Sequence, residues 1–155
     1  MSSGNRRPAR LKRDLQQAVR LDLRTWLDLF RAAIELAIAR VRLGSQQARD
    51  LHSVADAAGR QPPPTLDMDR ANLVERVAFA IPRAGYRLPW RADCLVQALA
   101  AQRWLRRHGI ATQLVIGARK PAPAAFAAHA WLKVGERVVT GGDISGYIPL
   151  IGNRG

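Results

Sequence analysis

Cysteine is almost absent from the sequence: a single one stands among 155 residues, so no disulfide can close within the chain and no oxidising compartment is needed. Long apolar runs are absent too, and none is long enough to cross a bilayer. The opening segment MSSGNRRPAR lacks the apolar core and cleavage site of a signal peptide. We therefore expect a cytoplasmic protein without a membrane span, and its length fits most simply one domain.

Acidic residues are also scarce, with 12 Asp and Glu against 25 Lys and Arg, which gives a formal net charge of +13. Such a balance is the usual footprint of nucleic-acid binding. Here, however, the basic residues are spread along the chain, and no zinc-ligand spacing, aromatic–basic interleaving or helix-turn-helix signature accompanies them. We expect no nucleic-acid partner; the charge is compatible with an acidic peptide or protein.

Helical periodicity dominates the first part of the chain. It predicts helices over residues 11–43, 67–81 and 93–108, ended by Gly44, by Pro82 with Gly85, and by Gly109. Three consecutive prolines break the pattern after Gln61 and favour an extended connection. We therefore divide the chain into a disordered tail (1–10), a helical segment (11–60), a proline-rich connector (61–66) and a core (67–155).

The first helix has a narrow polar stripe on an otherwise apolar perimeter. The stripe consists of Arg24, Asp28, Arg31, Glu35 and Arg42, which fall together at 3.6 residues per turn. A helix this apolar must be covered on more than one side. Either it packs across the core of its own domain, or part of its apolar face docks a partner protein; an interfacial membrane helix is a third, weaker interpretation.

After Gly109 the periodicity changes to two, which indicates strands. Strands are predicted over 112–119, 127–134 and 137–140, with a Gly135-Glu136 hairpin turn between the last two and a final apolar segment over 147–151. Helices followed by an antiparallel sheet indicate an α+β domain in which the helix over 93–108 packs centrally on the sheet.

Cys94 begins this central helix, directly after Asp93, which can cap it. A helix N-terminus stabilises the thiolate, which is the nucleophilic form of cysteine. A lone cysteine is nevertheless more often an inert, buried small hydrophobe. The sequence must supply a base before Cys94 indicates catalysis.

His129 is the candidate base. His108 is explained by its place at the end of the central helix, where a cation complements the dipole, and His52 lies in a weakly patterned region. His129 and Trp131 share one face of a predicted strand, and we expect that face to meet the helix that begins at Cys94.

Asp143 is the candidate acid. The predicted strand over 137–140 runs back along the strand of His129 and so brings Asp143 beside His129, where a carboxylate would orient the imidazole. Taken alone, Asp143 is typical of a turn residue after two glycines. Trp90 and Trp131 are candidate substrate-binding walls of the cleft, although core packing explains either equally well.

Four stretches carry a resemblance to a family: LPWRADCLVQALA at 88–100, LRRHGI at 105–110, LVIGARK at 114–120 and HAWLKVGERVV at 129–139. Together they resemble the transglutaminase-like cysteine peptidase domain of lasso peptide biosynthesis B proteins, over about residues 67–151. The resemblance implies a papain/transglutaminase-like core with Cys94 as nucleophile, His129 as base and Asp143 as orienting acid. Because a helical pattern stands where some family members carry a strand-containing recognition domain, it also implies the split form of these proteins.

The activity implied by the resemblance is removal of the leader peptide from a ribosomally made lasso precursor. Its partners would be the precursor peptide, a separate leader-recognition protein and a macrolactam-forming cyclase. No cofactor or metal is expected, and no phosphate-binding loop of the GxxxxGK[ST] kind is present. Two alternatives stay open: a transglutaminase or acyltransferase that uses the same three residues, and a non-catalytic basic adaptor in which Cys94 is merely buried.

Overall fold

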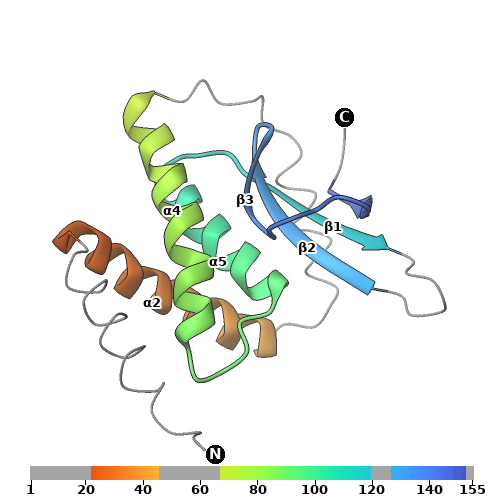
Figure 1. The fold of residues 1–155 in the computed structure, drawn as a ribbon, viewed down its shortest axis with the longest axis horizontal. Helices are drawn as coiled ribbons and strands as arrows, with labels where there is room; N and C mark the ends of the chain where they lie inside the picture. The colour runs from red at the N-terminus through yellow and green to blue at the C-terminus, as the bar shows by residue number, and fades with distance from the viewer. Residues whose placement is uncertain (1–21, 46–66, 120–126, 153–155) are drawn as a thin grey trace, which may run out of the picture.

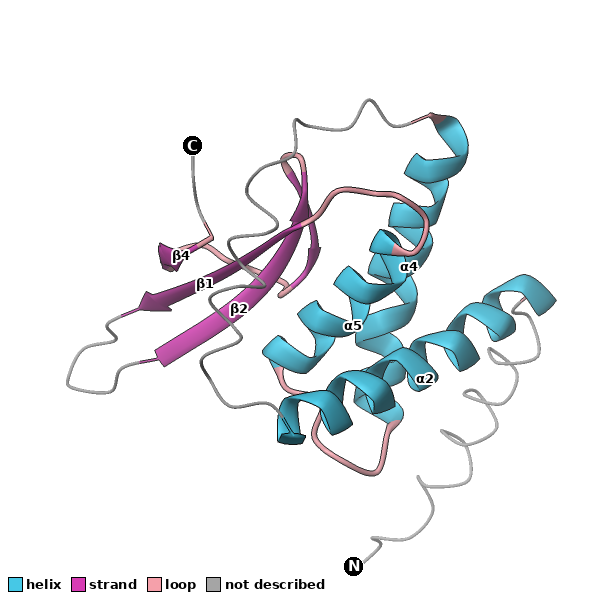
Figure 2. Ribbon diagram, turned by 180° about the vertical axis from the view of Figure 1, so that it is seen from behind, coloured by secondary structure: helices cyan, strands magenta, loops and turns pink. Residues whose placement is uncertain are grey.

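The computed structural model describes residues 22–45, 67–119 and 127–152. These residues form three helices, α2 (Leu23–Ser45), α4 (Met68–Arg87) and α5 (Cys94–Arg106), followed by four strands, β1 (Gln113–Arg119), β2 (Ala127–Val134), β3 (Arg137–Thr140) and β4 (Ile148–Ile151). Figures 1 and 2 show α4 and α5 between the sheet and α2. The α+β class expected from the sequence is confirmed. The tail over 1–10 and the connector over 61–66 lie outside the described residues.

The sheet has the strand order β3-β2-β1-β4, with all neighbours antiparallel. The hairpin from β2 to β3 turns at Gly135, whose φ of 55° lies in the left-handed region that favours glycine. β4 does not extend the meander beyond β3; it crosses to the other edge and pairs with β1. The loop that makes this crossing contains Asp143, which places that residue at the end of the sheet where β3 stops.

α5 is the central element, in agreement with the sequence prediction. It contacts α2, α4 and the first three strands. Its side chains Trp104 and Leu105 are completely buried, as are Val77 and Ile81 of α4 and Leu114 and Leu132 of the sheet. Each large apolar side chain buried in this way stabilises the fold by about 1.5–3 kcal/mol. This shared core holds Cys94, the first residue of α5, in a fixed position relative to the sheet.

α4 begins where the sequence predicts and ends later. The carboxylate of Asp67 accepts a hydrogen bond from the backbone N–H of Arg70 at 2.8 Å, so Asp67 is the N-cap. The expected stop at Pro82 is wrong, because the helix runs through Pro82 to Arg87. Ile81 and Ala84 on either side of the proline are buried in the core, and their packing offsets the lost backbone hydrogen bond.

α2 packs the two acids of its polar stripe inward, whereas Arg24 and Arg42 of the stripe are exposed. Asp28 is 7 % exposed and forms a bidentate pair with Arg76 of α4. Glu35 is 2 % exposed and lies 3.5 Å from Arg103 and 3.3 Å from Arg107. The two acids therefore connect α2 to α4 and to the end of α5. The same helix contributes Ala32, Leu36 and Ala39 to the core, so at least one apolar face of α2 packs within its own domain.

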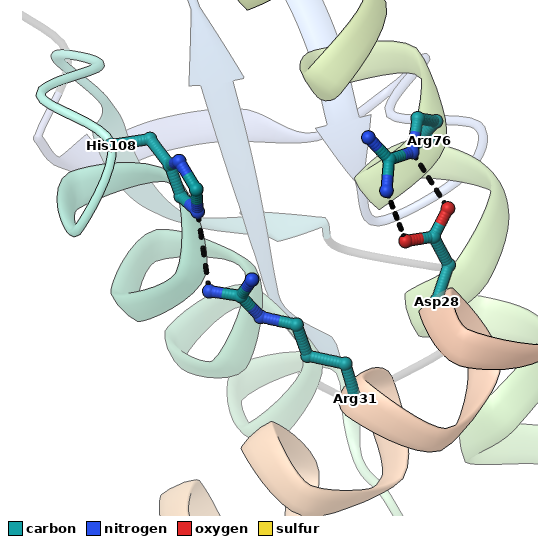
Figure 3. A network of polar contacts seen from close by, with 4 residues as sticks. All are labelled: Asp28, Arg31, Arg76 and His108. Atoms are coloured by element: carbon teal, nitrogen blue, oxygen red, sulfur yellow. Dashed lines mark hydrogen bonds and ion pairs between the residues drawn. The ribbon is translucent and has the colours of Figure 1, made fainter. Parts of the chain in front are cut away.

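His108 lies beside this interface, as Figure 3 shows. Its Nε2 is 3.2 Å from Nη2 of Arg31, and partial burial together with the positive charges of Arg31 and Arg76 lowers the pKa of His108 below its ordinary value of 6.5. Because a guanidinium only donates hydrogen bonds, Nε2 accepts this bond and carries no proton. This contact does not fit the expected role as a cation that complements the dipole of α5.

No helix within the described ranges is both long and apolar enough to span a bilayer.

Candidate active site

A pocket of about 510 Å³ opens between α4, the start of α5 and the edge strand β3. It contains both Cys94 and His129, which are 35 positions apart in the sequence (129 − 94). The remaining lining residues come from the two helices, from the whole of β3 and from the two glycines after it: Ala78, Pro82, Gln97, Arg137, Val138, Val139, Thr140, Gly141 and Gly142. The fold thus brings the predicted nucleophile and the predicted base to one concave site.

Cys94 is the first residue of α5 and is partly buried. Asp93 has the extended backbone of an N-cap, but its side chain makes no capping hydrogen bond and instead lies 3.5 Å from the guanidinium of Arg91. The expectation that Asp93 caps α5 therefore holds for the backbone position and not for the side chain. The first-turn N–H groups of α5 keep their positive dipole end at Cys94, where it favours a thiolate or an oxyanion.

His129 on β2 is held by a backbone carbonyl. Its Nε2 lies 2.7 Å from the carbonyl oxygen of Gly141. Because a carbonyl oxygen only accepts hydrogen bonds, Nε2 must carry the proton, which leaves Nδ1 of the neutral ring as the free, basic nitrogen. Gly141 has a φ of 109°, and a Cβ there would collide with Trp131, so this carbonyl can be presented only by glycine.

The face of β2 that carries His129 differs from the prediction. Leu132 and Val134 belong to the core closed by α5, so the alternating His129 and Trp131 lie on the opposite face of the strand. His129 nevertheless lines the pocket, and it lies in the part of β2 that has no β3 partner, since the pairing of β3 with β2 ends at Leu132. Among the described residues no hydrogen bond joins Cys94 to His129.

Asp143 does not reach the imidazole. It is exposed in the loop after β3, and its Oδ1 accepts a hydrogen bond from the backbone N–H of Ser145 at 2.9 Å. Hydrogen bonds from the Ser145 side chain and backbone, with the nearby charge of Arg119, lower the pKa of Asp143 below its ordinary value of 3.8. The expected contact with His129 is made instead by the carbonyl of Gly141, because Asp143 is engaged by its own turn.

The two tryptophans are outside the pocket. Trp131 is 2 % exposed and packs in an aromatic cluster, in which the His129 ring lies 6.1 Å from Trp131 and 4.9 Å from Tyr147 between ring centroids. Trp90 is 37 % exposed in the turn before α5 and is not among the lining residues. The structure therefore gives Trp131 a packing role beside the base, and neither tryptophan is placed as a cleft wall.

Three polar residues of the pocket are not among the candidates that the sequence indicated. Gln97, one helical turn after Cys94, donates from Nε2 to the carbonyl of Ala92 at 2.8 Å, so its amide lies beside the start of α5. Arg137 pairs with Glu75 of α4 through two hydrogen bonds of 3.0 and 2.8 Å. Thr140 is 2 % exposed, and its hydroxyl has no partner within the described part of the chain. Only Gln97, at a three-residue spacing from Cys94, carried a signal that could have found it.

Comparison with known families identifies the family to which the chain belongs. The family model of the transglutaminase-like superfamily matches residues 17–151. The chain belongs to the transglutaminase-like superfamily. This superfamily generally uses cysteine-based catalysis and includes cysteine peptidases. The match begins before α2, so α2 and the later elements fall within one family unit. Neither the curated proteins nor the solved structures yielded a match.

Among the described residues, no three His, Cys, Asp or Glu side chains are grouped so that they could hold a metal ion. The groups that could do chemistry in the pocket are a thiol, an imidazole, a side-chain amide and the first-turn N–H groups of a helix. These are the components of acyl transfer through a thioester.

Proposed function

We propose that this transglutaminase-like protein is a cysteine peptidase that removes the leader peptide from a ribosomally made lasso precursor. The observation that carries the proposal is the shared pocket of Cys94, at the N-terminus of α5, and His129, whose Nδ1 is free to act as a base. The four sequence stretches around Cys94 and His129 support the lasso assignment. The Arg-rich surface is compatible with an acidic precursor.

The reaction follows from these groups. Nδ1 of His129 takes the thiol proton of Cys94, and the thiolate attacks the last carbonyl carbon of the leader. The C–N bond then breaks, the imidazolium returns its proton to the leaving amine, and the leader stays on Cys94 as a thioester. Water, deprotonated by His129, attacks the thioester and releases the leader acid and the free thiol.

The oxyanion of each tetrahedral intermediate needs two donors. The backbone N–H of Cys94 supplies one, at the dipole end of α5. We assign the second to the side-chain amide of Gln97, which has one N–H bound to Ala92 and a second N–H left for the pocket. A side chain on a helix leans toward the preceding turn, which brings this amide toward Cys94.

The partners of this reaction are part of the proposal. The precursor would be delivered by a separate leader-recognition protein, and the released core peptide would pass to a macrolactam-forming cyclase. Arg137 stands at the pocket in a pair with Glu75, both more than half exposed, so the pair can open to receive a carboxylate of the precursor.

The test is incubation of the purified chain with precursor peptide and recognition protein, followed by mass spectrometry. Free leader with a C-terminal carboxylate and free core peptide are expected from the unmodified chain, and neither from Cys94→Ala or His129→Ala.

Gln97→Ala should lower kcat about 10²-fold with KM nearly unchanged, because the amide acts only on the oxyanion. Gln102→Ala, on the same helix but outside the pocket, is the matched control for amide loss, with a folding check because Gln102 is buried.

Two outcomes would favour the alternatives. Adducts in which an added amine replaces water at the leader carbonyl, or loss of ammonia from a glutamine of the peptide, would indicate a transglutaminase or acyltransferase. Full function of Cys94→Ala, together with steeply salt-dependent DNA binding, would indicate the non-catalytic adaptor.

A further inference from the structure

The side of α2 that faces away from α4 and α5 is apolar and exposed. Its large side chains are between 44 % and 73 % exposed to solvent: Leu23, Trp26, Leu27, Phe30, Ile34 and Val41. We call these six residues the outer α2 face. Scattered apolar residues are common on protein surfaces, but a continuous row along one helix marks a site of interaction.

The row has the spacing of a coiled-coil seam. Leu23, Leu27, Phe30, Ile34 and Val41 follow one another at steps of four, three, four and seven residues, and Ala37 fills the missing step. Steps that alternate between four and three give a narrow seam with a 3.5-residue period, into which a second helix packs knobs into holes. The seam runs from Leu23 to Val41, which is 18 helical steps (41 − 23), or about 27 Å of helix.

Apart from Asp22 at the N-terminal end of the helix, the exposed charges beside the seam are positive. The acids within α2, Asp28 and Glu35, are turned into the core and neutralised there by arginines of α4, α5 and the segment after α5. Arg24 and Arg40 remain exposed, one on each side of the seam by helical phase. Arg40 donates to the backbone carbonyl of Arg91 at 3.1 Å, a contact that leaves its positive charge in place.

We propose that the outer α2 face docks an amphipathic helix of a separate acidic protein, with apolar residues along its seam and Asp or Glu at its borders. A second copy of this chain would set arginine against arginine at the seam borders, which is destabilising. A lipid surface would favour a broad apolar face opposite a charged one, whereas the opposite side of α2 is packed in the core. The proposal is independent of the activity at the pocket.

The position of the outer α2 face suits a scaffold or delivery partner. Figure 2 shows α2 on the far side of α4 and α5 from the sheet. The pocket lies where α4, α5 and β3 meet, on the sheet side of that helical layer. A helix bound to α2 would therefore leave the pocket open.

The probe is a synthetic helix of about 21 residues, three heptads long, with Leu at both seam positions of each heptad and Glu at the flanking positions, and its matched control carries Lys in place of Glu. Fluorescence anisotropy with the full chain should show the Glu helix binding at least about tenfold more tightly than the Lys helix, with the difference shrinking as salt rises. Leu27→Ser with Phe30→Ser should weaken binding by a similar factor. Met68→Ser with Ile148→Ser, equally exposed but elsewhere on the surface, should not.

A charge reversal makes the test stricter. Arg24→Glu with Arg40→Glu should reverse the preference, so that the Lys helix binds more tightly, while circular dichroism shows an unchanged fold. Equal binding of both helices would overturn the proposal. So would binding of the chain to phosphatidylglycerol vesicles without binding to the Glu helix, a dimer that Leu27→Ser with Phe30→Ser dissociates, or binding that appears only after residues 1–21 are deleted.

Discussion

At the scale of single residues, the orientation of His129 depends on a backbone atom. The carbonyl of Gly141 fixes the tautomer of the imidazole and its position, which is the role that the sequence assigned to the carboxylate of Asp143. The two groups are only two residues apart on the same loop, and a sequence pattern identifies side chains but not the direction of a backbone carbonyl. The consecutive glycines, with φ values of 109° and 63°, were the available signal, since they mark a backbone that follows an unusual path.

Asp143→Asn separates these two roles. We expect kcat/KM for leader removal to fall by less than about tenfold, because Gly141 still holds Nε2 of His129. If Asp143 were the orienting acid, the loss would be about 10⁴-fold, as expected when a triad carboxylate becomes an amide. Because the pKa of Asp143 is lowered below 3.8, its carboxylate stays ionised and keeps its Ser145 hydrogen bonds above that pH. The bonds are lost only when the carboxylate is protonated at lower pH. The acid limb of the pH–rate profile should therefore be the same in the variant and the parent chain.

At the scale of elements, α4 lacks one backbone hydrogen bond where it lines the pocket, and this lowers the stability of the helix. Pro82 has no N–H to donate to the carbonyl of Ala78, and both residues line the pocket. Pro82→Ala should restore this bond and raise the free energy of unfolding by about 1–3 kcal/mol, measured by urea denaturation. Asn72→Pro, at an exposed position of the same helix, is the reverse control and should lower it. An unchanged or lower stability of Pro82→Ala would show that the proline is matched to its surroundings.

The elements themselves were largely predictable, and the reasons for the misses are physical. β2 and β3 have the predicted bounds, because alternating apolar residues and a glycine-led turn are local signals. The continuation of α4 past Pro82 depends on Ile81 and Ala84 packing against other elements, which no local pattern contains. The same holds for Asp28 and Glu35 of α2, which face inward because they meet arginines of other helices. The face of β2 that carries His129 was mispredicted because the local pattern does not show which face of the strand α5 packs against.

The candidate site was predictable in part for a similar reason. Cys94 at a helix start and His129 on a strand were found because their residue types are rare in this chain. Gln97, Arg137 and Thr140 were not, because amides, arginines and threonines are common and become pocket residues only through tertiary structure. The exposed seam of α2 was predictable in part. The sequence predicted an apolar helix that must be covered on more than one side, and within the described residues α4 and α5 cover one side and leave the outer face exposed.

At the scale of the whole molecule, α2 shares one core with the other elements and should unfold together with them. Substitution of its buried acids tests this. Asp28→Ala and Glu35→Ala each leave buried or half-buried arginines without their partner, so each should lower the free energy of unfolding by about 3 kcal/mol. Glu136→Ala removes an acid that is 98 % exposed and should change it by less than about 0.5 kcal/mol. Because α2 shares one core with α4, α5 and the sheet, circular dichroism and tryptophan fluorescence should follow a single, coincident urea transition in every variant. A separate early transition of helical signal in Asp28→Ala would instead mean that α2 is an independently unfolding attachment, and that its outer face is presented by a mobile helix instead of a fixed one.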